Sequence, residues 1–217
     1  HLVADVAGYF PPGARFVPLN PARLLDTRPG KATVDGAGEG GGATVVGTPV
    51  VVPVGGRAGV PDNAAAAVLN VTVAEPAGAG HVAAYPCGEE PPTASNVNYA
   101  PGDAAVPNLV IVKLGSAADV CLVSGVSGSH LIADVAGYFP AGADYTPLVP
   151  GRLLDTRAGR TTVDNAHVGD GKPAVGAPIA LPVAGRHEIP GDALAVVLNV
   201  TAADTDGAGY LKVWPCD

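Results

Sequence analysis

The chain is poor in cationic, aromatic and sulfur-containing residues, and these shortages exclude whole classes of function. Only 12 of its 217 residues are lysine or arginine, against 20 aspartates and glutamates, which gives a formal net charge of −8. Because phosphate binding needs a clustered excess of positive charge, we expect no nucleic-acid partner. No run of about 18 apolar residues exists, so we expect no membrane span. A signal peptide and an initiator methionine are both missing, and we therefore expect a mature or excised piece of a longer protein.

The abundant residues favour short strands joined by turns. The chain has 30 glycines and 22 prolines, which break helices and supply turns. Its many valines and threonines fit a pleated sheet, and a hydrophobic content of 47% is enough to build a core. We therefore expect an all-β fold.

The sequence contains one long internal repeat. Residues 1–88 align with residues 130–217 without a gap, and 49 of these 88 positions are identical. The offset between the two aligned segments is 129 residues. Solenoids repeat about every 20 to 50 residues, so a period of this length suits a whole small domain repeated in tandem. The matching segments are HLVADVAGYF and HLIADVAGYF (from His1 and His130), PARLLDTR and PGRLLDTR (from Pro21 and Pro150), VLNVT (from Val68 and Val197), and GAGHVAAYPC and GAGYLKVWPC (from Gly78 and Gly207).

The repeat divides the chain into three parts. We expect residues 1–14 to be the terminal strand of a preceding repeat, residues 15–140 a complete β-sandwich repeat, and residues 141–217 the first part of the next repeat. The predicted fold class is all-β, with tandem, jelly-roll-like β-sandwich domains of about 129 residues per repeat. Apolar alternation and turn signals predict nine strands in one period, at residues 16–19, 24–28, 49–54, 66–74, 80–86, 95–99, 108–114, 120–124 and 130–139.

The three cysteines are best understood through the repeat. Cys87 and Cys216 occupy the same position in two copies, so the natural disulfide joins Cys87 to Cys121 and leaves Cys216 without a partner. Such a bridge implies an oxidising compartment, here the cell exterior. Buried free thiols are the alternative, and a metal site is disfavoured because no paired C-x-x-C arrangement is present.

The motifs follow one another in a fixed order. RLLDTR is followed by VLNVT, by an aromatic residue before Pro-Cys, by TASNVN, by PNLVIVKLG and by HLIADVAGYF. This series resembles the tandem β-repeat domain of secreted actinobacterial cell-surface proteins, and the resemblance covers essentially the whole chain. It implies an extracellular location and a modular architecture, because such domains are appended to enzymes or joined into large surface proteins. It implies no particular ligand.

The RLLDTR motif carries a concentrated polar cluster in each copy. An aspartate beside arginines can bind a sugar, a cation or an acidic partner. The favoured interpretation is structural, with charge-assisted hydrogen bonds that pin a strand to a neighbouring loop. Asp5 and Asp134, in the ADVAGYF motif, are expected to point outward or cap a turn, or else to pair with these arginines across a junction between units. The cluster residues are Arg23, Asp26 and Arg28 in one copy and Arg152, Asp155 and Arg157 in the other.

The predicted function is that of a non-catalytic structural or adhesive repeat module in a stalk, surface layer or filament. Its expected partners are neighbouring repeats or copies of itself. Only a short segment, from Pro140 to Tyr145, joins consecutive units, which favours a rigid rod. If the chain ends are genuine, a strand such as residues 1–10 is expected to complete a neighbour's sandwich by strand addition.

A carbohydrate-binding module appended to a secreted enzyme is the alternative. Its partner is a cell-wall or extracellular polysaccharide, and its candidate sugar platforms are Tyr85, Tyr99, Tyr210 and Trp214. An aromatic content of only 5%, and the position of two of these rings beside Pro-Cys, favour core packing instead.

Catalytic and cofactor motifs are missing. Neither H-E-x-x-H nor G-x-S-x-G occurs, so we expect no enzyme and no cofactor. A calcium hypothesis rests on the sequence Asp204-Thr205-Asp206-Gly207, and it is weakened because no glutamate follows at the twelfth position of such a loop.

Overall fold

The computed structural model describes residues 2–10, 15–142, 145–193, 195–207, 211, 213 and 216. These residues form eleven strands and no helix, which confirms the all-β expectation. The strands are β1 (Leu2–Phe10), β2 (Val17–Asp26), β3 (Val50–Pro53), β4 (Ala64–Ala74), β5 (Gly80–Pro86), β6 (Val97–Tyr99), β7 (Ala105–Lys113), β8 (Asp119–Gly125), β9 (His130–Pro140), β10 (Thr146–Asp155) and β11 (Ala195–Ala202).

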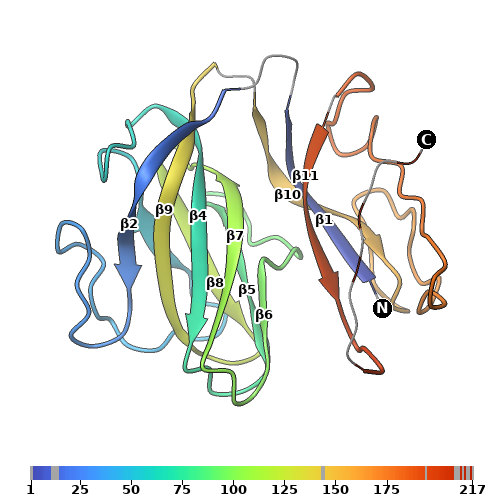
Figure 1. The fold of residues 1–217 in the computed structure, drawn as a ribbon, viewed down its shortest axis with the longest axis horizontal. Coiled ribbons are helices and arrows are strands. Elements are labelled where there is room, and N and C mark those ends of the chain that lie inside the picture. Colours follow the sequence, from blue (N-terminus) through green and yellow to red (C-terminus); the bar gives the residue numbers. More distant parts are fainter. Residues whose placement is uncertain are drawn as a thin grey trace.

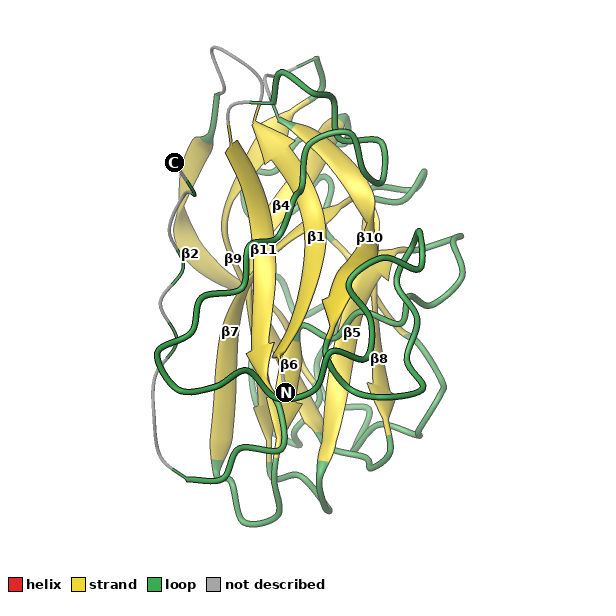
Figure 2. Cartoon of the chain, turned by 90° about the vertical axis from the view of Figure 1, so that its right-hand side faces the viewer, coloured by secondary structure: helices red, strands yellow, loops and turns green. Residues whose placement is uncertain are grey.

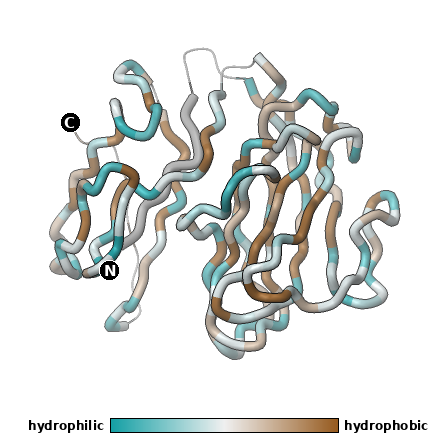
Figure 3. Tube along the Cα trace, turned by 180° about the vertical axis from the view of Figure 1, so that it is seen from behind, coloured by the Kyte–Doolittle hydropathy of each residue, from teal (hydrophilic) through white to brown (hydrophobic). Residues whose placement is uncertain are grey.

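Two four-stranded antiparallel sheets face each other across one core (Figure 1). Their strand orders are β2-β9-β4-β7 and β3-β8-β5-β6. Fully buried side chains from both sheets fill the space between them, among them Leu69 and Val135 from one sheet and Val82 and Leu122 from the other. Figure 3 shows hydrophobic residues concentrated along these strands. The fold is therefore sandwich-like, as the alternation of apolar residues predicts.

The strand count between residues 15 and 140 differs from the prediction: eight strands form instead of nine. The two segments predicted at residues 16–19 and 24–28 are one strand, β2, which runs from Val17 to Asp26 alongside β9. The register shifts between Pro18 and Ala22 absorb Pro21, which a strand at the edge of a sheet tolerates. Arg28 lies beyond the end of β2, so the prediction of a strand that extends to residue 28 is wrong at its last two residues.

A third, three-stranded sheet has the order β10-β1-β11 (Figure 2). Its central strand, β1, comes from the start of the chain, whereas its outer strands lie after residue 145. A loop of residues 156–193 covers one face of this sheet, where Leu148, Leu153 and Ile189 form a small buried cluster.

The third sheet meets the sandwich through an aromatic contact. The ring of Tyr145, just before β10, lies 4.4 Å from the ring of Phe139 at the end of β9, and Phe16 lies 5.4 Å from Phe139 on another side. Tyr145 is buried with Phe139 in a cluster that Val197 of β11 also contacts. Burial raises the pKa of the Tyr145 phenol well above its usual range. The connection between the two parts of the chain is therefore packed against both of them.

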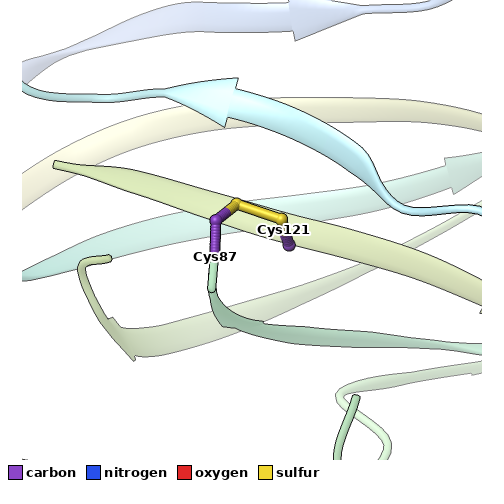
Figure 4. The surroundings of a disulfide bond; sticks show 2 residues. All are labelled: Cys87 and Cys121. Carbon is purple, nitrogen blue, oxygen red and sulfur yellow. A yellow bond between two sulfur atoms is a disulfide. The ribbon is translucent and has the colours of Figure 1, made fainter. Parts of the chain in front are cut away.

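One disulfide joins Cys87, directly after β5, to Cys121 in β8, with 5.0 Å between the Cα atoms (Figure 4). The predicted pairing is confirmed, and free thiols are excluded at these two positions. The bridge links two adjacent strands of the β3-β8-β5-β6 sheet. Cys216 is free and exposed, in line with the expectation that it has no partner in this chain.

We expect removal of this bridge to destabilise the fold. The double substitution Cys87→Ala/Cys121→Ala opens a loop with a sequence separation of 34 residues and should lower the free energy of unfolding by about 3 to 4 kcal/mol. Urea titration followed by circular dichroism measures the change. The matched control, Cys216→Ala, should leave the midpoint in place, and an unchanged midpoint in the double variant contradicts the prediction.

Candidate functional site

The RLLDTR cluster is a buried carboxylate held by two arginines. Asp26 is completely inaccessible to solvent. Its Oδ1 accepts a hydrogen bond from Nε of Arg28 at 3.0 Å, and its Oδ2 accepts one from Nη2 of Arg28 at 2.8 Å. Nη1 of Arg23 donates to the same Oδ2 at 2.8 Å. The two side chains of Arg23 and Arg28 therefore grip one carboxylate from two sides.

Asp134 completes this cluster from the neighbouring strand. Nε of Arg23 donates to Oδ1 of Asp134 at 2.8 Å, and Arg23 lies directly opposite Asp134 in the pairing of β2 with β9. Asp134 therefore pairs with an arginine of the cluster inside one sheet, and the hypothesis that it does so across a junction between units is wrong. Asp5 lies opposite Arg152 in the pairing of β1 with β10, which is the equivalent place in the strand register.

The second copy of the cluster has the same geometry. Asp155 is also fully buried, and Nε and Nη2 of Arg157 donate to its Oδ1 and Oδ2 at 2.9 and 2.8 Å. Nη1 of Arg152 donates to Oδ2 of Asp155 at 3.1 Å. Nη2 of Arg152 also donates to the carbonyl of Thr93, in the sandwich.

The glycine-rich loop after β2 is fixed to this cluster through the backbone. The amide of Asp26 donates to the carbonyl of Gly38 at 3.0 Å, and Gly40 donates back to the carbonyl of Asp26 at 2.8 Å. In the second copy His167 stands in place of Gly38, and its carbonyl accepts from Asp155 at 3.0 Å. Gly38 has φ 77° and His167 has φ 56°, so the same left-handed conformation recurs although one residue has a side chain.

A second arginine–aspartate pair, which the sequence analysis missed, anchors the same loop. Arg57 donates from Nε and Nη2 to the carboxylate of Asp35 at 2.7 and 2.6 Å, and also to the carbonyl of Leu24 at 3.1 Å. Arg186 repeats this contact with Asp164 at 2.6 and 2.8 Å. Both residues of the pair are identical at the equivalent positions of the two copies, and that identity is the signal that points to it.

The arginines lower the pKa of all four aspartates. Burial alone would raise the pKa of Asp26, but hydrogen bonds and charge from Arg28 outweigh it, and the pKa falls below its usual value of 3.8. Asp155 is lowered in the same way by Arg157. Hydrogen bonds from Arg57 bring the pKa of Asp35 to about 2, and those from Arg186 hold the pKa of Asp164 well below its usual range. All four groups are therefore anions at neutral pH.

Two of the four candidate sugar platforms are buried. Tyr85 is 2% exposed and Tyr99 is 6% exposed, so neither offers a ring face to a sugar. The hydroxyl of Tyr99 donates to the carbonyl of Ser127 at 2.6 Å, as expected for a tyrosine in a core. Tyr210 and Trp214 lie outside the described residues.

A hollow of about 520 Å³ lies where the sandwich meets the third sheet. Three arginines contribute positive charge to its lining, Arg152, Arg157 and Arg160, and the first two also bind the carboxylate of Asp155. Burial, and then the charge of Arg152, lower the pKa of His81 in the same wall, which favours neutral imidazole. Hydroxyl and amide groups complete the lining, from Thr93, Ser95, Asn98, Thr161 and Thr201.

The candidate calcium residues do not form a cluster in the described part of the chain. Asp206 of the calcium hypothesis is exposed and pairs with the ammonium of Lys172. Within the described ranges, no group of three or more His, Cys, Asp or Glu side chains comes together. In the same part of the chain, no helix has the length and apolar character needed to cross a membrane.

Comparison of the chain with protein-family models, with curated proteins and with solved structures finds no match.

We expect loss of the Asp26 charge to be costly. Asp26→Asn leaves the partly exposed Arg23 and Arg28 facing a neutral, buried group. It should lower the free energy of unfolding by about 3 kcal/mol, the lower end of the cost of breaking a buried pair, because water still reaches both arginines. Urea titration measures this value. The matched control is Asp206→Asn, which breaks an exposed pair with Lys172 and should leave the urea midpoint almost unchanged. Equal effects of the two substitutions would contradict a buried structural role.

The lowered pKa values predict acid sensitivity. A carboxylate whose folded pKa lies below its unfolded value of 3.8 contributes stability above about pH 4, and this contribution is lost as the pH falls through the folded pKa. We therefore expect the urea midpoint to decrease between pH 4 and pH 2. The variant Asp35→Asn/Asp164→Asn should show a shallower decrease over that interval, and an identical slope in the variant argues against the arginine pairs as its cause.

Proposed function

We propose that this chain is a non-catalytic structural module of the cell exterior, built from tandem β-sandwich repeats of about 129 residues. The observation that carries the proposal is the recurrence, at equivalent positions of the two copies, of one buried aspartate with the same two arginines and the same loop anchor. In each copy these charges serve the chain's own strands and loops. This pattern suits a scaffold that is used more than once along a polypeptide.

Location outside the cytoplasm is supported by the disulfide. The bond between Cys87 and Cys121 persists only where the surroundings are oxidising. The order of motifs resembles that of secreted actinobacterial surface proteins, which fits the same location. A net charge of −8 further suits a protein exposed to solvent and not bound to nucleic acid.

A rod-like arrangement is supported by the connection between β9 and β10. Only five residues, 141–145, separate the two strands, and the last of them, Tyr145, is buried against Phe139. A short connection with a packed aromatic ring limits the angles that neighbouring units can adopt. Such units form a stalk, a surface layer or a filament more readily than a flexible string.

Binding of an acidic polysaccharide is the second candidate. The hollow with Arg152, Arg157 and Arg160 favours it, because guanidinium groups recognise carboxylates and sulfates. The buried positions of Tyr85 and Tyr99 leave neutral sugars without these two platforms.

Immunogold labelling of intact source cells tests the proposal. We expect antibodies against the folded chain to label the outside of intact cells, in fibres or layers with a regular spacing of one unit. Labelling that appears only after the cells are permeabilised contradicts it. The second candidate is tested on an array of acidic polysaccharides, where binding that is lost in Arg160→Ala would favour the polysaccharide role.

A further inference from the structure

The place of β1 in the third sheet is that of β9 in the sandwich. β1 lies between β10 and β11 (Figure 2), and β9 lies between β2 and β4 (Figure 1). Among the described residues, β1 is the strand that pairs with the facing edges of both β10 and β11. It satisfies the backbone N–H and C=O groups along these two edges.

The register of β1 repeats that of β9 pair by pair. Val3 lies opposite Asp155 and Thr201, and Ile132, the equivalent residue of β9, lies opposite Asp26 and Thr72. The offset between the two copies relates all six pairs of β1 with β10 and all eight pairs of β1 with β11 to pairs made by β9. A shift of one residue in the pairing register would move every side chain of β1 to the other face of the sheet. The agreement in register therefore indicates a specific site and not a generic sheet edge.

The irregularities of the pairing recur as well. The register shifts after Val6 in β1, next to Gly8, and it shifts after Val135 in β9, next to Gly137. Bulges of this kind re-aim a strand and are specified by the sequence on both sides of the ladder. The strand and the slot between β10 and β11 therefore match in detail.

The sequence of β1, the strand that would be donated, is almost the same as that of β9 in the other copy. The sequences HLVADVAGYF and HLIADVAGYF differ at one position, Val3 against Ile132. In the structure β1 reaches its slot from the start of the chain, and the whole sandwich, within residues 11–145, lies between β1 and β10 in the sequence. The slot thus accepts a strand that is not adjacent to it in sequence.

Exchange of such a strand between chains preserves every backbone pair. The closed and exchanged forms then differ only in the connection from Phe10 to Val17 and in the entropy of association, so concentration decides between them. This connection has six residues, and Pro11 and Pro12 begin it. Short connections between an exchangeable element and its domain favour the swapped form.

We propose that the slot between β10 and β11 is a strand-binding site whose ligand is the β1 strand of a second copy of this chain. Because the donor strand and the slot are different surfaces, successive exchanges join chains head to tail into an open polymer. This inference deepens the proposed structural role and rests on the equivalence of the repeats.

Cross-linking between differently tagged chains tests the site. One copy of the chain carries Val3→Cys and the other Thr201→Cys, both with Cys216→Ser, and the two are co-secreted into an oxidising compartment. Because positions 3 and 201 are opposite in the register, we expect a covalent species of twice the monomer mass that contains both tags. Reduction should return it to the monomer mass.

The matched control pairs Val3→Cys with Ala195→Cys, the residue opposite Phe10 at the other end of β1. Six residues along a strand span about 20 Å, too far for a disulfide, so this pair should give no dimer. A single chain with both Val3→Cys and Thr201→Cys reports whether β1 fills the slot of its own chain.

Each result of the cross-linking experiment either supports or overturns strand exchange. A dimer from the first pair alone supports exchange between chains. Monomers from the first pair overturn the proposal, whether the doubly substituted chain cross-links internally or not, and equal dimer yields from both pairs overturn it too. Surface labelling of cells is independent of this result, so failure of strand exchange and failure of the structural role are distinguishable.

Discussion

The grip of two arginines on the buried carboxylate of Asp26 is the interaction on which the surrounding structure depends. Through Arg23 it joins the end of β2 to Asp134 of β9, and through its backbone it holds the glycine-rich loop. A charge without solvent is tolerable only when opposite charges and hydrogen bonds compensate it, so each partner constrains the others. The arginines compensate the buried charge of Asp26, and the backbone of Asp26 in turn holds the long glycine-rich loop in place.

The same arrangement at Asp155 lies in a less covered environment. In the sandwich, the sheet β3-β8-β5-β6 covers Leu69 completely. The equivalent Leu198 in β11 is only partly buried, against loop residues such as Leu181 and Val183. Despite this difference, the strand register, the arginine contacts and the left-handed loop backbone are alike in both places. The polar contacts and the strand pairing are therefore alike at two places that differ in burial.

Much of this could be read from the sequence, and the exceptions have physical reasons. Period-two alternation located most strands, and the repeat identified the pairing of Cys87 with Cys121. The continuity of β2 was not predictable, because Pro21 is a turn signal unless its strand lies at a sheet edge. The contact between Asp35 and Arg57 joins residues 22 positions apart around a loop, and no local pattern encodes it. The choice of Thr93 by Arg152 depends on how two parts of the chain meet in space.

The contact between the tilted rings of Phe139 and Tyr145 has a mechanical consequence. The backbone passes from β9 to β10 in five residues, and the ring at the end of that passage lies in a cluster shared by both parts of the chain. Under tension along the polypeptide, the ring of Tyr145 must leave this buried cluster before the connection can straighten. The packed connection therefore resists extension more strongly than an exposed glycine linker of the same length would.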